Sequence, residues 1–168
     1  MGTQSRYAQM RGSCLDVLAT LRLPRTCGTD EFTDAVSRCT RSKVRLVPLR
    51  LPQACTALWL GDTGADRIGY NQDWPADVIS LAAHAVGHLA LGHCDQVRDG
   101  GQFACTVGKL GPDDRCLLGR HLHDPAISPL FSDGEESEAA MFAHALAEWL
   151  GIQPVPPYAD DAMRTCVG

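Results

Sequence analysis

Apolar residues recur at helical spacing through the first forty positions of the chain. Residues 6–21 predict a helix that ends before Pro24. Its apolar face is expected to hold Leu15, Leu18, Ala19 and Leu21. A second helix is predicted to begin at a cap formed by Thr29 or Asp30. Its apolar side is expected to carry Phe32, Ala35, Val36 and Cys39.

The pattern then changes to the alternation of apolar and polar residues that is typical of strands. Residues 43–49 predict a strand, and Pro48 within it indicates an edge position, because proline cannot donate a ladder hydrogen bond. Residues 57–60 and 67–71 flank the turn-rich segment 61–66. This arrangement predicts a β-hairpin with a loop somewhat longer than the tightest kind.

Residues 78–91 are apolar almost throughout, which is typical of a helix that is buried on most sides. The helix is predicted to open with a cap at Asp73 or Trp74, and with Pro75 near its first turn. Two histidines, His84 and His88, interrupt its apolar sequence.

The remainder of the chain is predicted to contain an insert and a final helix. Residues 94–132 show a mixed pattern, with a possible short helix at 113–122, and are expected to lie over the core. The final helix is predicted to start near Ser132 or Asp133 and to stop at Gly151.

Length and composition indicate a single domain over residues 1–168, with its core at about 24–151 and a tail at 152–168. There is no run of roughly 18 apolar residues and no apolar signal-peptide core at the start, so we expect a cytoplasmic protein without membrane contact. The eight cysteines include no CxxC pair, which favours reduced thiols over a disulfide framework or a thiolate metal site.

Charge is distributed unevenly along the chain. The net charge is −5, but residues 1–50 carry an excess of five positive charges and residues 51–168 an excess of ten negative ones. The acidic part argues against direct nucleic-acid binding. The basic part is expected to be a solvated face that could also steer an acidic partner.

The histidine pair carries the main chemical signal. Residues four apart lie on one face of a helix, one turn from each other, so both imidazoles of His84 and His88 can reach one ion. In the zinc-peptidase pattern HExxH the residue after the first histidine is a glutamate that acts as general base. Here Ala85 occupies that position. The spacing therefore predicts metal binding without the catalytic base.

A third ligand is expected from the acidic start of the final helix. Either Ser132 with Glu135 or Asp133 with Glu136 could close a capping box there, and the first alternative leaves Glu136 available for a metal. His93 is nine residues from the first histidine and is expected on the opposite face, as a helix-end residue favoured by the dipole.

These motifs together resemble the ImmA/IrrE-like metallopeptidase family, in particular its short actinomycete-type members. The resemblance covers roughly residues 10–150. It rests on four features in order: the hairpin at 57–71, LAAHAVGHLALGH at 81–93, an irregular insert and ESEAAMFA at 136–143. RLVPLRLP at 45–52 matches a stretch that precedes the hairpin in the short members.

The resemblance implies a zincin-like α+β fold, in which a small β-sheet packs on a buried metal-binding helix with additional helices. It implies Zn²⁺ held by His84, His88 and Glu136, with Glu138 as the second choice for the carboxylate. Ala140 replaces the Asn or Asp usual in the family, which should weaken the outer shell of the metal. The missing base at Ala85 puts hydrolysis in doubt.

The function implied is that of a regulatory zinc metallopeptidase, inactivated by Ala85, whose relatives cleave a partner protein such as a helix-turn-helix repressor. The alternative is a non-catalytic zinc-binding regulator that binds its protein or peptide partner through the peptidase groove.

Overall fold

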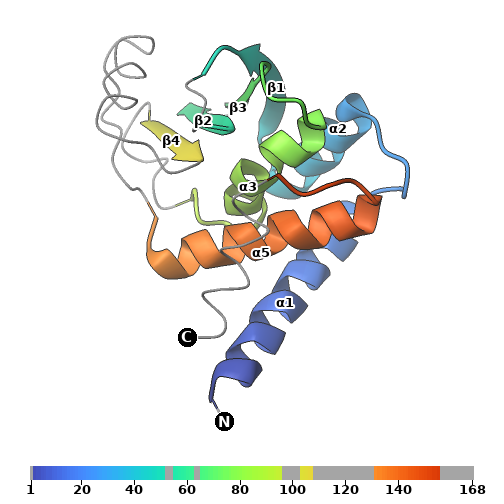
Figure 1. Ribbon diagram of the computed structural model, residues 1–168, viewed down its shortest axis with the longest axis vertical. Helices are drawn as coiled ribbons and strands as arrows, with labels where there is room; N and C mark the ends of the chain where they lie inside the picture. The colour runs from blue at the N-terminus through green and yellow to red at the C-terminus, as the bar shows by residue number, and fades with distance from the viewer. Residues whose placement is uncertain (1, 52–54, 63–64, 96–102, 108–130, 156–168) are drawn as a thin grey trace.

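The computed structural model describes residues 2–51, 55–62, 65–95, 103–107 and 131–155. Within these ranges the chain has an α+β fold, as the sequence predicts (Figure 1). The elements are α1 (Gly2–Leu21), α2 (Thr29–Thr40), β1 (Lys43–Leu49), β2 (Ala57–Asp62), β3 (Ala65–Asn71), α3 (Val78–Ala90), β4 (Phe103–Val107) and α5 (Asp133–Leu150).

The strands form one mixed sheet in the order β1-β3-β2-β4. β1 runs parallel to β3, whereas β2 is antiparallel to both β3 and β4. The edge position predicted for the strand with Pro48 is confirmed, because β1 is an outer strand of this sheet. The predicted hairpin is also present, but it is tighter than expected, since its strands pair as far as Asp62 and Ala65.

Helix α3 lies between the sheet and α5 (Figure 1). It contacts β2 and β3 on one side and α5 on the other, and every residue from Ile79 to Leu89 is buried. The sheet contributes Trp59 and Ile68 to the core, and α5 contributes Phe142 and Leu146. The all-round apolar sequence of α3 is therefore explained by its enclosure.

Helix α3 begins later than predicted. Its N-cap is Asp77, whose Oδ1 accepts hydrogen bonds from the backbone N–H groups of Ile79 at 2.8 Å and of the next residue at 3.4 Å. The predicted caps, Asp73 and Trp74, belong to the preceding turn. There the N–H of Asp73 donates to Oδ1 of Asn71 at 3.2 Å. An Asx turn therefore forms from Asn71 to Asp73, and the helix begins only after Asp77.

The prediction for the start of α2 is also wrong. Its N-cap is Gly28, with no side-chain capping bond, so neither Thr29 nor Asp30 takes that position. The carbonyl of Gly28 accepts the first helical hydrogen bond, from the N–H of Phe32 at 3.0 Å. Asp30 instead lies in the first turn, where its negative charge still favours the helix dipole.

The apolar face of α1 differs from the predicted one. Leu18 and Leu21 are buried as expected, but Leu15 is 37% exposed and Ala19 is exposed. Cys14 takes the buried position instead, with its thiol at 3.6 Å from the carbonyl of Glu138. The helix therefore packs against α5 along a stripe rotated from the one that the leucines indicate.

Part of the segment expected to be an insert belongs to the sheet. Within 94–132, residues 103–107 form β4 and pair with β2. The short helix predicted at 113–122 lies outside the described residues. Where the structure describes the chain, no helix is long and apolar enough to cross a membrane. The cysteines described in full are free thiols, namely Cys14, Cys27, Cys39, Cys55 and Cys94.

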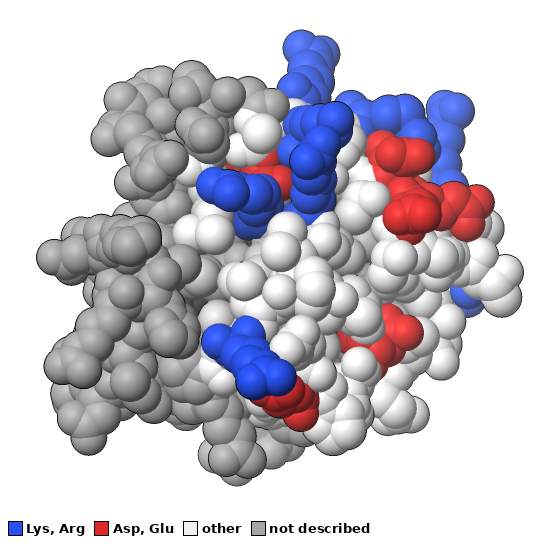
Figure 2. All heavy atoms as spheres, turned by 90° about the horizontal axis from the view of Figure 1, so that it is seen from above, with Lys and Arg blue, Asp and Glu red and all other residues white. Residues whose placement is uncertain are grey.

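Basic side chains gather on the outward face of the sheet. Lys43 and Arg45 of β1 and Arg67 of β3 are exposed, and Arg45 is the register partner of Arg67. Their strand neighbours Val44 and Ile68 point into the core. Figure 2 shows Lys and Arg side chains lying close to one another on the face seen from above, with Asp and Glu nearby. Lys43 and Arg45, two of the basic residues of the N-terminal part, are thus exposed to solvent.

Candidate metal centre

His84 and His88 lie one turn apart in the buried second half of α3. His84 is 4% exposed and His88 is 1% exposed. Their rings meet edge to face, with centroids 4.9 Å apart, and their Nε2 atoms are 3.1 Å apart. Two imidazoles in an apolar helix would be costly to bury without polar partners, so their convergence on one point indicates a common partner.

The carboxylate that meets them comes from the first turn of α5. Ser132 caps this helix in a full capping box: its Oγ accepts from the N–H of Glu135 at 3.3 Å, and a carboxylate oxygen of Glu135 accepts from the N–H of Ser132 at 2.8 Å. Glu135 therefore serves the helix end. The next residue, Glu136, is left to point towards α3, as the first of the two capping alternatives requires.

Glu136 contacts both histidines. Its Oε2 lies 2.9 Å from Nε2 of His84, and its Oε1 lies 3.5 Å from Nε2 of His88. Ligand atoms of the three side chains all lie within 4.8 Å of one another. The cluster could therefore bind a metal ion. Since the side chain of Glu136 is 43% exposed, the cluster is open to solvent on that side.

Gly87 allows the two helices to approach this closely. A Cβ atom at this position would lie 3.0 Å from the carbonyl oxygen and 3.1 Å from the Cα atom of Ala139 on α5, and 3.2 Å from a ring carbon of Phe142. Any larger residue would press against backbone that cannot move without shifting α5. Gly87 thus lets α5 come close enough to α3 for Glu136 to contact both histidines.

The protonation states of His88 and Glu136 are those of metal ligands. Burial lowers the pKa of His88 to about 4 and outweighs the opposing effect of Glu136, so its ring is neutral at pH 7. Burial raises the pKa of Glu136, but its interactions with His84 and His88 have the larger combined effect and lower the pKa to about 2. A neutral imidazole and an ionised carboxylate are the forms that coordinate metals.

Ala85 is buried at 1% exposure and forms part of the apolar core. Its methyl group cannot accept or donate a proton. Among the residues predicted for the site, it is the one that brings no chemistry to the cluster.

His93 and Glu138 occupy positions that differ from those expected. His93 is not on the opposite face: its Nδ1 lies 3.0 Å from Nδ1 of His88. Glu138, the second choice for the carboxylate ligand, lies 3.0 Å from Nε2 of His93 and not at the metal cluster. The expectation for His93 fails because α3 ends at Ala90 and the chain turns back, which helical spacing does not describe.

Phe131 is a further residue of the site that the sequence pattern did not indicate. Its ring stacks on that of His88, with centroids 3.9 Å apart and an angle of 15° between the planes. It also lies 6.2 Å from Trp59 of β2. A lone aromatic residue just before a helix carries no periodic signal, so only the fold reveals this contact.

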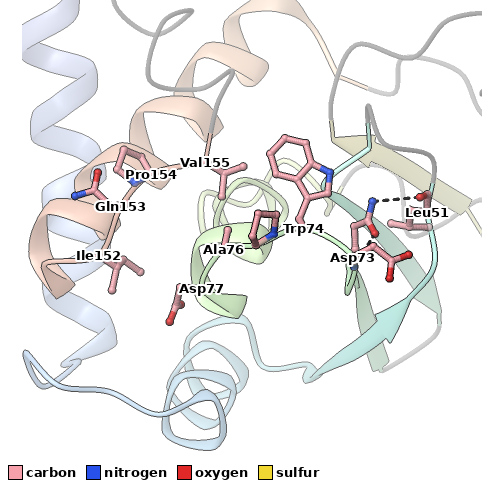
Figure 3. Close-up of a pocket in the computed structure, with 11 residues that line it drawn as sticks. Leu51, Asp73, Trp74, Ala76, Asp77, Ile152, Gln153, Pro154 and Val155 are labelled. Atoms are coloured by element: carbon pink, nitrogen blue, oxygen red, sulfur yellow. Dashed lines mark hydrogen bonds between the residues drawn. The ribbon is translucent and has the colours of Figure 1, made fainter.

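A separate cavity of about 870 Å³ opens at the N-terminal end of α3 (Figure 3). Trp74 and Asp77 line it from the segment that leads into the helix, Leu51 from the segment after β1, and residues 152–155 from the segment after α5. None of its lining residues belongs to the cluster of His84, His88 and Glu136. Comparison with protein-family models, curated proteins and solved structures finds no match for this chain.

Proposed function

We propose that this chain is a regulatory zinc metallopeptidase of the ImmA/IrrE type whose hydrolytic activity is lost because Ala85 replaces the general base. In this form it binds a partner protein, such as a helix-turn-helix repressor, without cleaving it. The observation that carries the proposal is the convergence of His84, His88 and Glu136 in a largely buried cluster next to Ala85.

The donor geometry supports zinc as the ion. Ligand atoms at 2.0–2.1 Å from a tetrahedral zinc are about 3.3 Å apart. Here the two Nε2 atoms are 3.1 Å apart, Oε2 of Glu136 lies 2.9 Å from Nε2 of His84, and its Oε1 lies 3.5 Å from Nε2 of His88. Two imidazoles with one carboxylate form the His₂Glu set of catalytic zinc sites, which leaves a fourth position open. The exposed side of Glu136 gives that position access to solvent.

The loss of hydrolysis follows from the residues around the ion. Zinc, when bound, polarises a carbonyl group and lowers the pKa of water. Peptide hydrolysis also needs a group that takes a proton from the attacking water and returns one to the leaving amine. Glu136 is engaged with both histidines, and Ala85 has no proton acceptor. Loss of a positioned acid–base group costs about 10²–10⁴-fold in rate.

The arrangement of the sheet supports a zincin-like scaffold that recognises extended peptides. β4 is an outer strand of the described sheet and contacts α3, the helix that carries the histidines. A peptide that adds to such a strand would bind through main-chain hydrogen bonds close to the cluster.

The alternative function, a non-catalytic zinc-binding regulator, is favoured by the environment of Ala85. This residue is packed in the apolar core at 1% exposure, so a glutamate there would have to displace neighbours to reach a substrate. Under this alternative the groove binds a partner and has no role in cleavage.

The substitution Ala85→Glu separates the two functions. We expect the purified parent chain to contain one zinc ion by mass spectrometry, and Ala85→Glu to restore cleavage of a partner repressor by roughly 10²–10⁴-fold. Each form is co-expressed with candidate repressors from the same genome, and the partner is followed by intact mass. The control is Ala85→Gln, which has similar size but is a poor base.

The outcomes are distinct. If Ala85→Glu binds zinc and partner as the parent does but cuts nothing, the peptidase proposal is replaced by the binding regulator. If the parent chain binds no zinc, both functions are wrong.

A further inference from the structure

The ring nitrogen of His88 that faces away from the metal cluster lies against a second histidine. Nδ1 of His88 is 3.0 Å from Nδ1 of His93, and Nε2 of His93 is 3.0 Å from Oε2 of Glu138. We propose that His93 and Glu138 are positioning residues that hold His88 in the tautomer and orientation of a metal ligand. This inference rests on the metal centre proposed above.

The backbone is arranged to bring His93 to this place. α3 ends at Ala90, and Gly92 follows with a φ of 80°, in the left-handed region that favours glycine. The N–H of His93 then donates to the carbonyl of His88 at 3.0 Å. The chain reverses within a few residues, so the His93 side chain returns to the helix that it has just left and is 8% exposed there.

The contacts allow one satisfactory placement of protons for neutral rings. Glu138, as a carboxylate, only accepts hydrogen bonds, so Nε2 of His93 must carry the hydrogen between them. A neutral His93 then has a bare Nδ1, which accepts from Nδ1–H of His88. A neutral His88 with hydrogen on Nδ1 has a bare Nε2, and that atom can accept from Nε2–H of His84, 3.1 Å away. Through His93, the carboxylate of Glu138 therefore leaves Nε2 of His88 with the lone pair that metal coordination needs.

The reverse placement is unfavourable at Glu138. If Nδ1 of His93 donated to His88, a neutral His93 would turn a lone pair towards the carboxylate of Glu138. His88 would then carry its hydrogen on Nε2, where it blocks the metal. Partners of this kind, which fix the tautomer of a ligating histidine from behind, contribute to metal affinity in general.

Phe131 restricts the remaining freedom of the His88 ring. It stacks on the ring face at 3.9 Å between centroids, while His93 holds the ring edge. The same geometry excludes His93 as a substitute for the missing base, because it contacts the nitrogen of His88 that points away from the cluster. Its role is confined to positioning.

Zinc affinity of the full chain, measured by competition with a chelator, tests the inference. His93→Leu should weaken zinc binding by about 10–100-fold. His93→Gln should recover much of the loss, because its side-chain carbonyl can accept from Nδ1–H of His88. The matched control is His144→Leu: His144 also pairs with a glutamate, Glu148 at 3.3 Å, but lies in the middle of α5 outside the cluster. It should leave zinc affinity unchanged.

A second measurement reports the proton positions directly. In metal-free protein labelled with ¹⁵N-histidine, NMR should show the Nδ1–H tautomer at His88 and the Nε2–H tautomer at His93. Glu138→Gln should mix both tautomers at both rings, since an amide can donate as well as accept. A role limited to packing would leave the tautomers unaltered.

Failure of the metal centre and failure of the positioning role give different results. If the parent chain binds no zinc, the metal centre itself is wrong. If the parent binds zinc and His93→Leu binds it equally well, or if His88 carries its hydrogen on Nε2 in the metal-free parent, the positioning role is wrong while the metal centre stands. The melting temperature of each metal-free variant, compared with that of the parent, separates loss of folding from loss of a ligand.

Discussion

The two ends of α3 differ in what they offer a ligand. At the N-terminal end a cavity of about 870 Å³ opens, with an apolar majority among its lining residues, and the carboxylate of Asp77 there already accepts helix N–H groups. Towards the C-terminal end, the polar atoms of His84, His88 and Glu136 converge within 4.8 Å. The difference teaches that the convergence of titratable groups, and not the volume of a cavity, marks the candidate metal centre in this fold.

The largest expected effect comes from removing a metal ligand towards the C-terminal end of α3. His84→Ala should weaken zinc binding by more than about 100-fold, because loss of an outer partner alone costs about 10–100-fold. Asp73→Asn, which neutralises a carboxylate lining the cavity, should leave zinc affinity unchanged. Isothermal titration with zinc measures both. Similar losses in the two variants would contradict the assignment of the metal to one end of the helix.

A smaller effect is expected where α3 and α5 meet. Gly87→Ala should destabilise the protein, since overpacking costs about 1–3 kcal/mol and exceeds the helix-propensity gain of about 0.5–1 kcal/mol. It should also weaken zinc binding by shifting Glu136. Gly12→Ala in α1, where a Cβ atom meets nothing within 4 Å, should instead raise the melting temperature. Thermal unfolding of both variants checks the prediction, and stabilisation by Gly87→Ala would refute the close contact.

The smallest effect is expected at the N-terminal end of α3, next to the cavity. Asp77→Ala removes the cap of α3 and should cost about 1 kcal/mol of unfolding free energy, or about 2–4 °C in melting temperature for a chain of this size. Zinc affinity should hardly change, because the ligands lie two turns or more further along. Ser132→Ala, at the cap of α5 next to Glu136, should cost a similar amount and also weaken zinc binding. Equal zinc affinities in these two variants would show that the start of α5 does not orient Glu136.

The local parts of the site could be predicted from the sequence. The spacing of His84 and His88 puts them on one face of a helix wherever the helix lies. The apolar residues around them predict burial, which the structure confirms. The sequence predicts a capping box that pairs Ser132 with Glu135 or Asp133 with Glu136, and the structure has the first pair, which leaves Glu136 available. Ala85 shows from the sequence alone that no general base follows the first histidine.

The contacts between elements were decided only by the tertiary structure. Glu136 reaches His84 across 52 positions of the chain because Gly87 lets α5 approach α3. His93 returns to His88 because the backbone at Gly92 adopts a positive φ, which periodicity cannot register. Asp77 replaces the expected cap because Asp73 lies in a turn, where its N–H donates to the side chain of Asn71. Spacing along a chain fixes geometry within one helix or strand, whereas the distances between elements depend on how side chains far apart in sequence pack together.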